Sequence, residues 1–534
     1  MDAFPRLQSY SPPPPPRLNW LDRTLGYFAP MAGLRRIRAR AAAAVLVRHY
    51  EGAAAGRRTQ GWKRPSGDAN ASLLPFILNL RYSARDLVRN NGYAESALTT
   101  ICDHVVGWGI VAKPKPVNAQ AATLWEKWAG TTACDADGRN TFAGLQHLVM
   151  RTVVESGEVL IRKRLRKPTD GATPGPDVTP LPIPVQIQVL EPDYLDTGKN
   201  PNGRLPNGGQ IIAGVEFDAI GRRVAYWLFP EHPGSYTSVL AGASVRVPAE
   251  SVLHIYRQDR ASQVRGASWF APVLLKFKDF DDFDDATLMK QKVAACLSIV
   301  TTDVDGTAPA LGEVDPANPT IDSLEPGGVL NLAPGRTVEV VQPPSVREYA
   351  DYSRTTLRGI ATGLGISYED LTGDYTATNF SSARMSRLRH WARVEGWRWR
   401  MLIPQFCDPV WVWAMEIASM LEKGPREIPA AEWTAPPLPM IEPDREGLAY
   451  QRNIRGGLMT QSEALRERGY DPEVVFAEMA SDNARLDKLG LILDSDPRNT
   501  TQAGQPRQVA AKEAPAAEPA AEEPATDEAD GATE

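Results

Sequence analysis

The side chains with the clearest capacity for chemistry are five aspartates within one short stretch, Phe277–Ala286. They are Asp279, Asp281, Asp282, Asp284 and Asp285. Two-metal nucleases hold their ions with converging carboxylates, so a metal-dependent nuclease is one hypothesis for this cluster. On a helix, however, consecutive side chains point in different directions, and no second acidic group in the sequence completes a site. An acidic helix face is the favoured interpretation, and such a face would repel DNA if many copies lined a channel.

A second conspicuous stretch, residues 381–400, is rich in arginine and tryptophan. Arginine beside tryptophan can stack on the bases of a single strand. The apolar residues of this stretch recur at helical spacing, however, and arginine stems can cover apolar surface. Packing against a neighbouring helix or subunit is therefore favoured over base recognition. The residues expected in this packing are Arg384, Arg387, Trp391, Arg393 and Trp397.

Familiar catalytic and metal-binding motifs are missing from the sequence. There is no phosphate-cradling GxxxxGK[ST], no GxSxG nucleophile elbow and no HExxH zinc motif. The six histidines stand singly, and none is paired at metal-ligand spacing. Among the four cysteines no CxxC pair occurs, which favours buried thiols in a reducing compartment: Cys102, Cys134, Cys296 and Cys407. We expect no catalytic residue, no cofactor and no metal.

The elements that must position these residues form a mixed α+β chain of 534 residues, large enough for more than one domain. Helical periodicity marks the ranges 84–106, 119–130, 142–157, 268–301, 346–364, 381–421, 444–456 and 461–493. Residues 158–256 instead carry β-like runs separated by Pro, Gly and Asn clusters. The runs are 159–161, 185–189, 211–217, 224–229 and 251–256. Asp218–Gly221 is predicted to be a hairpin loop with a positive φ at Gly221.

The two ends of the chain differ in charge. Residues 1–66 carry about twelve Lys and Arg against about three Asp and Glu, whereas the last twenty or so residues are acidic. We expect a flexible Pro-rich arm over 1–18, a basic helical segment and linker over 19–72, and a disordered acidic tail over 496–534. The basic end either contacts nucleic acid or an acidic partner surface, or is only a solvated tail. No apolar run is long enough to span a bilayer, so no membrane association is expected.

Several segments, taken in order over about residues 20–490, resemble the lambda-like family of bacteriophage portal proteins. Each segment is weak by itself, and the ordered set is strong. The segments are Arg85–Ala94 with Asp103–Gly107, Val189–Asp193, Val252–Tyr256 with Arg265-Gly266, Gly363–Leu371 running on to Arg384, and Gly457–Arg466.

This resemblance implies a structural protein, not an enzyme, with a portal fold of wing, stem, clip and crown. Twelve copies would form a ring at the unique capsid vertex, through which viral DNA is packaged and ejected. The implied partners are the terminase large subunit, the major capsid protein and scaffold, the head–tail connector protein and double-stranded DNA held without sequence preference. The implied location is the virion, with assembly in the host cytoplasm.

The order of the segments predicts how the chain is divided. We expect the N-terminal part of the wing at 73–140, a stem helix at 141–164, a β-rich clip at 165–262 and a second stem helix with the acidic segment at 263–300. Wing strands follow at 301–345, the channel loop and long wing helix at 346–425, and crown helices at 426–495. The residues expected in the channel loop are Thr372, Asp374, Tyr375, Thr376 and Asn379.

Local signals agree with a loop at this place. Gly363 and Gly365 can end the preceding helix, and Ser367, three residues before Asp370, can cap a short helical turn. Ser381 or Ser382 is expected to cap the long helix that follows the loop. The predicted arrangement is helix, sharp break, exposed loop and long helix.

Overall fold

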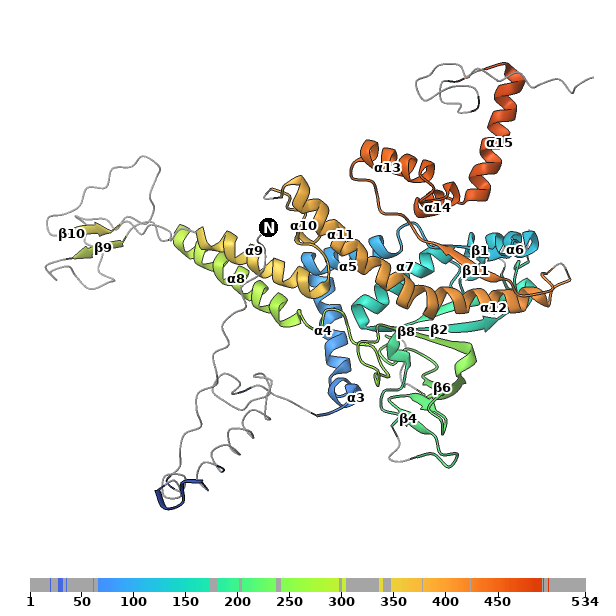
Figure 1. The fold of residues 1–534 in the computed structure, drawn as a ribbon. Coiled ribbons are helices and arrows are strands. Elements are labelled where there is room, and N and C mark those ends of the chain that lie inside the picture. The colour runs from blue at the N-terminus through green and yellow to red at the C-terminus, as the bar shows by residue number, and fades with distance from the viewer. Residues whose placement is uncertain are drawn as a thin grey trace, which may run out of the picture. The chain divides into compact units, whose positions relative to one another are not determined.

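The computed structural model describes residues 27–31, 66–171, 180–200, 204–236, 242–296, 300–303, 336–339, 347–376, 378–422 and 424–491, with single residues elsewhere. Its contacts divide the chain into Met1–Gly67 and Asp68–Glu534, and the elements below all belong to the second unit (Figure 1). The predicted Pro-rich arm, most of the basic segment and nearly all of the acidic tail lie outside the described residues. Within the described ranges, no helix combines the length and apolar character needed to cross a membrane.

Helices make up most of the described residues of the second unit. They are α3 (Ala69–Leu73), α4 (Ile77–Asn90), α5 (Gly92–Val105), α6 (Ala119–Ala129), α7 (Phe142–Ser156), α8 (Leu274–Cys296), α9 (Arg347–Leu364), α10 (Tyr368–Thr372), α11 (Phe380–Trp397), α12 (Asp408–Ser419), α13 (Pro443–Arg455), α14 (Gln461–Glu467) and α15 (Pro472–Leu489). A π-helical segment, Arg398–Cys407, joins α11 to α12. The long helix predicted over 381–421 is therefore present, and its middle part is a π-helix.

In the part of the chain that the structure describes, the strands form four small antiparallel sheets. They are β1 (Val111–Lys115), β2 (Glu158–Leu165), β3 (Val185–Leu190), β4 (Gln210–Ile212), β5 (Val215–Phe217), β6 (Arg223–Leu228), β7 (Val245–Pro248), β8 (Val252–Tyr256), β9 (Val300–Asp303), β10 (Arg336–Glu339) and β11 (Ala430–Thr434). The sheet orders are β3-β2-β8, β4-β5-β6-β7, β1-β11 and β9-β10. The observed α+β architecture agrees with the predicted fold class.

The main core forms where helices cover the β3-β2-β8 sheet. Trp125 of α6, Phe142 of α7 and Trp411 of α12 are buried there, and the rings of Trp125 and Trp411 lie 4.8 Å apart. Phe406 from the π-helical segment stacks on Phe142 at 5.4 Å. Burying such side chains stabilises a fold by about 1.5–3 kcal/mol each. Because these residues come from distant parts of the sequence, their packing fixes the long C-terminal helix on the N-terminal helices.

The second sheet contains the predicted hairpin. Asp218–Gly221 joins β5 to β6, and Gly221 has φ 86°, as expected. The run predicted as one strand over 211–217 is two strands, because the chain turns at Ala213 and Gly214, both with positive φ. The turn presents the Ala213 carbonyl to Arg265 Nη1 at 2.8 Å, so the tertiary hydrogen bond favours a turn over a continuous strand.

Two helix predictions were wrong in their extent. The helix predicted over 84–106 is interrupted at Asn91, whose extended backbone lets its side chain accept the Ala94 N–H and cap α5. The stem helix predicted over 141–164 ends at Ser156, and β2 follows from Glu158. The reason is Gly157, whose φ of 92° disfavours helix continuation and whose missing side chain lets the Ala267 backbone approach closely.

Helices α8 and α9 run antiparallel in direct contact (Figure 1). Gly363 lies against Val273, Gly359 lies against Lys276, and the Phe283 ring lies 4.2 Å from Tyr352. Later residues of α8 therefore contact earlier residues of α9, as expected for two antiparallel helices. Phe277 and Phe280 are buried in the core, so the first half of α8 is anchored there, and the same half of the helix contacts α9 at Lys276 and Phe283.

A fully buried ionic network joins four elements around Glu158, the first residue of β2. Arg81 of α4 donates to this carboxylate at 2.8 Å, and Arg265 donates to it at 2.6 Å. His254 Nε2 of β8 donates to the same carboxylate at 2.9 Å, and so does the backbone N–H of Gly266 at 2.8 Å. The cationic partners hold the pKa of Glu158 well below its usual range, against the opposing effect of burial.

The first prediction concerns acid stability. Burial lowers the pKa of His254 from 6.5 to about 4. Between these values the unfolded chain binds a proton that the folded chain does not, so stability falls as the pH falls from about 6.5 towards 4. Replacing His254 by Gln keeps an N–H donor for Glu158 and removes the titration. The melting temperature of His254→Gln is expected to fall less steeply over this pH interval than that of the wild type. Equal slopes would contradict the assignment.

Candidate functional site at the loop between α10 and α11

The break before the loop is built as the sequence indicates. Helix α9 ends at Leu364, and Gly365, with φ 88°, donates its N–H to the Ala361 carbonyl at 2.9 Å. A side chain at position 365 would also lie 2.9 Å from the Arg393 guanidinium. Ser367 then accepts the Asp370 N–H at 2.9 Å and caps α10, which confirms the predicted capping residue.

The loop itself, residues 373–379, is held by its own polar side chains. Gly373, with φ 70°, ends α10, and the Asp374 carboxylate accepts bonds from Tyr368 Oη at 3.0 Å and from the Thr376 hydroxyl at 2.6 Å. Tyr375 is exposed, so the loop presents an aromatic ring to solvent. Thr372 Oγ1 donates to the Tyr368 carbonyl at 2.9 Å.

Asn379, not Ser381 or Ser382, caps the long helix that follows. Its side chain accepts the Ser382 N–H at 2.8 Å, and its extended backbone turns the chain into α11. The expected serine cap was wrong because the helix begins at Phe380, which places both serines inside the first turn. The predicted loop residue Asn379 is thus the junction between the loop and the helix.

Helix α5 holds α10, the helix from which the loop starts, by two hydrogen bonds. Ser96 Oγ donates to the Leu371 carbonyl at 3.0 Å, and Thr100 Oγ1 donates to the Asp370 carbonyl at 3.3 Å. One further turn along α5, His104 Nδ1 lies 2.9 Å from His390 Nε2 of α11. The three contacting helices α5, α10 and α11 are called the frame below. The loop starts at the end of α10 and ends at the start of α11, so both of its ends are attached to this frame.

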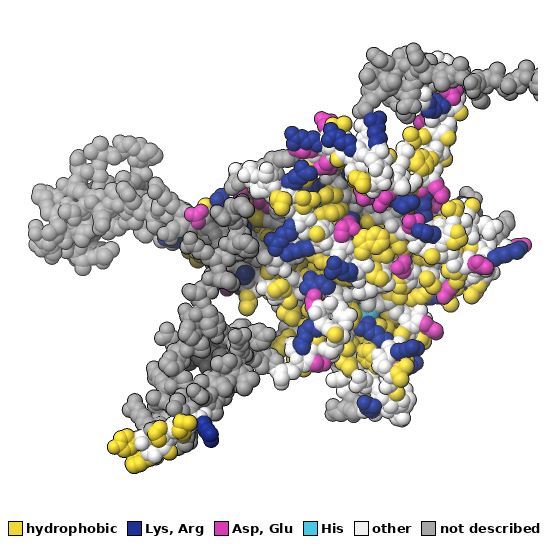
Figure 2. Space-filling model, viewed as in Figure 1, with side chains coloured by type: hydrophobic (Ala, Val, Ile, Leu, Met, Phe, Trp, Pro, Cys, Tyr) yellow, Lys and Arg dark blue, Asp and Glu magenta, His cyan; other side chains and the backbone are white. Residues whose placement is uncertain are grey.

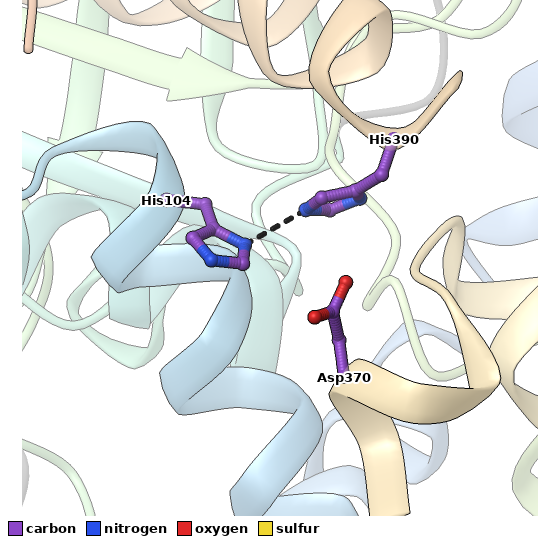
Figure 3. Close-up of side chains that lie close together, drawn as sticks. All are labelled: His104, Asp370 and His390. Atoms are coloured by element: carbon purple, nitrogen blue, oxygen red, sulfur yellow. Dashed lines mark hydrogen bonds between the residues drawn. The ribbon is translucent and has the colours of Figure 1, made fainter. Parts of the chain in front are cut away.

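A group of three possible ligands lies in this frame. His104, Asp370 and His390 each offer one atom, and these atoms lie within 4.8 Å of one another. Figure 3 shows the Asp370 carboxylate directed towards the two imidazole rings, which come from different helices. His390 is buried, whereas His104 and Asp370 are half-buried. Burial is the main cause that lowers the pKa of both histidines, so both rings are neutral at pH 7.

Sequence spacing did not indicate this group, because His104 and His390 are 286 positions apart. One signal was available. Each of the three residues lies in a stretch already singled out in the sequence: Asp103–Gly107, Gly363–Leu371 and the basic aromatic stretch 381–400. The structure shows that these stretches meet.

Arg398 fixes the far side of the frame. Its guanidinium is buried and donates to the Val105 and His104 carbonyls, both at 2.7 Å, and to the Pro436 carbonyl at 2.8 Å. The first two carbonyls end α5, so Arg398 caps the C-terminus of that helix with a positive charge. The side chain also lies 4.8 Å above the Trp391 ring.

The residues predicted for subunit packing divide into two groups. Trp391 and Trp397 pack within the chain, and the rings of Trp397 and Trp269 lie 4.9 Å apart. Arg393 lies against Gly365, whereas Arg384 reaches Glu442 at 3.6 Å and Arg387 is exposed. Lys and Arg side chains gather over α11 on the face shown in Figure 2. The tryptophans therefore serve packing between helices, while part of the arginine surface stays accessible.

The five aspartates of α8 do not converge. Asp281 accepts a bond from Asn91 at 2.7 Å, Asp282 pairs with Lys278 at 2.6 Å, and Asp284 accepts a bond from Tyr349 Oη at 2.8 Å. Asp279 and Asp285 are exposed. Neither of the two groups of three possible metal ligands in the described residues includes any of these acids. The acids diverge around the helix, so the nuclease hypothesis gains no support from the structure.

The cysteines fit the structural interpretation. Cys102, Cys134 and Cys407 are free thiols and are buried. Burial raises the pKa of Cys102 and of Cys134 to about 12, so neither is a reactive thiolate at neutral pH.

Comparison with known proteins decides the family. Residues 55–398 match the model described as phage portal protein, lambda family. The chain belongs to this family. Portal proteins are structural components of phage particles and not enzymes, so the resemblance seen in the sequence is confirmed.

Individual portal proteins match over most of their length. The probable portal protein of Halomonas phage phiHAP-1 is 24% identical over 473 residues, covering 84% of this chain and 88% of the relative. The portal protein of Escherichia phage N15 is 24% identical, covering 83% and 91%. Portal protein B of Escherichia phage lambda is 22% identical, covering 83% and 90%.

Two solved structures are also similar. A chain in the neck of a native gene transfer agent particle, with C12 symmetry, has a TM-score of 0.46 and 14% identity, covering 78% of this chain and 98% of that one. A chain from the virion of such a particle has a TM-score of 0.45 and 14% identity, covering 74% and 94%.

The second prediction tests the start of α11. Replacing Asn379 by Ala removes the cap and is expected to destabilise the protein by about 1 kcal/mol. Ser381→Ala is the matched control, since the structure gives that side chain no capping role. Urea denaturation of both variants measures the difference. Equal destabilisation by the two substitutions would place the cap elsewhere.

Proposed function

We propose that copies of this chain form the ring at the unique capsid vertex through which double-stranded DNA is packaged and ejected. The match to the lambda portal family over residues 55–398 is the observation that carries the proposal. In this proposal the ring has twelve members, nucleates head assembly and belongs to the virion. Its partners are the terminase large subunit, the major capsid protein and scaffold, and the head–tail connector protein, with assembly in the host cytoplasm.

Exposed apolar residues on the projecting helices support association with further copies. Leu275, Leu288 and Met289 of α8 are 79%, 53% and 61% exposed in the single chain. Helices α13 and α15 contain no buried residue, and α15 exposes Val474 and Met479. Such surface is usually covered by a partner. Neighbouring copies in a ring are the occupants that the family indicates.

The helix pair revises the proposed position of stem and clip. The sequence-based division placed the clip at 165–262, between helices at 141–164 and 263–300. Two strands of that region, β3 and β8, instead pair with β2 in the main core, and β4 to β7 form a separate sheet. A segment between two contacting antiparallel helices does exist: residues 297–346 lie between α8 and α9, and β9 pairs with β10 there. We assign α8 and α9 to the stem and 297–346 to the clip.

The remaining assignments follow from the same frame. The acids of α8 then lie on the stem, where exposed Asp279 and Asp285 would repel the phosphates of DNA and limit adhesion. The loop 373–379, with exposed Tyr375 at its tip, is proposed as the channel loop, and α13 to α15 are proposed as the crown. Contact with DNA at these elements is expected to be independent of base sequence.

The third prediction concerns the ring. Twelve copies of the 58.4 kDa chain have a mass of about 700 kDa. Native mass spectrometry is expected to find this species, and negative-stain images are expected to show rings with a central hole. A monodisperse monomer or dimer over a range of salt concentrations would count against the proposal.

The fourth prediction concerns the acidic face of α8. Repulsion between neighbouring copies is screened by salt, since the Debye length falls from about 30 Å at 0.01 M to about 10 Å at 0.1 M. Ring yield is therefore expected to rise with added salt. In the double variant Asp279→Asn with Asp285→Asn, the yield at low salt should rise and its salt dependence should weaken.

The matched control removes two exposed carboxylates outside α8, with Glu126→Gln and Glu422→Gln. This control should behave as the wild type does. A ring yield that falls with salt, or an equal response of both double variants, would show that the α8 acids do not govern assembly.

A further inference from the structure

We infer that His104, Asp370 and His390 form a binding site for one divalent transition-metal ion, with Zn²⁺ as the reference ion. The ion would join α5, α10 and α11 directly beneath the loop 373–379. The inference does not rest on the proposed ring, because each ligand belongs to the same chain. It also revises our expectation of no metal, which rested on spacing along the sequence.

The distances suit such an ion. His104 Nδ1 and His390 Nε2 are 2.9 Å apart, and the Asp370 carboxylate completes a group within 4.8 Å. Zinc binds imidazole nitrogen at about 2.0–2.1 Å and carboxylate oxygen at about 2.0–2.2 Å, so two nitrogens in a tetrahedral site lie about 3.3 Å apart. To hold the ion, the two rings must separate by a few tenths of an ångström, and the Asp370 carboxylate oxygen, now within 4.8 Å, must lie about 3.3 Å from each nitrogen. Three protein ligands leave a fourth position for water.

The hydrogen bonds of His390 prepare its lone pair for the ion. His390 Nδ1 lies 3.2 Å from the Gly365 carbonyl, which can only accept a hydrogen bond. Nδ1 therefore holds the proton, and the lone pair of Nε2 faces His104. Histidines that bind metals commonly donate their other ring N–H to a carbonyl or carboxylate in this way. Without an ion, His104 Nδ1 donates its proton to the Nε2 lone pair of His390 at 2.9 Å. With an ion bound, His104 would carry its proton on Nε2, and Nδ1 would bind the ion.

The charges also suit a cation. Asp370 contributes a carboxylate that accepts no hydrogen bond from the described residues. Arg387, Arg393 and Arg398 lie close enough to oppose a cation, so the attraction for the ion comes from the Asp370 carboxylate, with a further negative charge at Asp103. Imidazole ligands favour zinc, copper, nickel or iron over magnesium and calcium.

A second group in the described residues is less suitable. Glu191, Asp193 and His232 also lie within 4.8 Å of one another. Both carboxylates are already bound by Arg85 Nη2, at 2.9 Å from Glu191 and 2.7 Å from Asp193. An ion there would have to displace a guanidinium from two carboxylates. The second group therefore serves as a competing candidate site within the same protein, which the experiment can test alongside the first.

The test uses the full-length protein, stripped with a chelator and titrated with Zn²⁺ by calorimetry, with Mg²⁺ as the comparison ion. We expect one high-affinity zinc per chain, a rise in the melting temperature with zinc and no such response to magnesium. Cobalt(II) should give the visible absorption bands of a tetrahedral nitrogen and oxygen site. Asp370→Asn and His104→Gln should each weaken zinc binding by roughly 100-fold and abolish the thermal shift.

Two control variants separate this site from others. His147→Gln removes a partly exposed histidine outside both groups, and His232→Gln removes the histidine of the rival group. Both should bind zinc as the wild type does. Asp370→Asn preserves the shape of a half-buried side chain, so it is expected to remain folded if His104→Gln does not. Absence of stoichiometric zinc, unchanged binding by Asp370→Asn, or loss of binding in either control would overturn the inference.

Discussion

The buried carboxylate of Glu158 is the group on which the central arrangement of helices and strands depends. Burying an unpaired charge costs several kcal/mol, and removing one partner of a buried pair costs about 3–5 kcal/mol. Glu158 is tolerated only because Arg81, Arg265 and His254 surround it, all with fully buried side chains. These partners come from α4, from the segment before α8 and from β8. Each element is therefore held at a fixed distance from the start of β2.

The ionic network around Glu158 also determines where the projecting helices α8 and α9 begin. Arg265 is followed by Gly266, whose missing side chain lets the chain pass against Gly157 and Tyr256. Trp269 and Phe270 then enter the core, and α8 leaves it with Phe277 and Phe280 still buried. Because α9 is paired with α8, the break at Gly365, the loop and the start of α11 inherit their positions from the same network. The surface proposed to meet DNA and neighbouring copies thus has a rigid base.

The sequence predicted the local features that depend on few residues. The end of α9 at a glycine, the Ser367 cap, the hairpin at Gly221 and most strands appear where periodicity and turn residues placed them. Predictions failed where tertiary contacts outweighed local preference. The turn at Ala213 is held by Arg265. At Gly157 only the stem helix expected over 141–164 from the family order was wrong, because the sequence patterns had placed the helix over 142–157 and a β run at 159–161. The predicted cap at Ser381 or Ser382 was wrong because the conformation of the preceding loop makes the helix begin at Phe380, with Asn379 as its cap.

The sequence by itself determined the family, the mixed α+β character, the helix–loop–helix order around residues 364–384 and the acidity of α8. These properties are written in residue type and spacing along one segment. Only the tertiary structure decided which helices pair, that α8 lies along α9, and that His104 and Asp370 meet His390. Contacts between residues hundreds of positions apart depend on the packing of the whole core, which leaves no periodic signature in either segment.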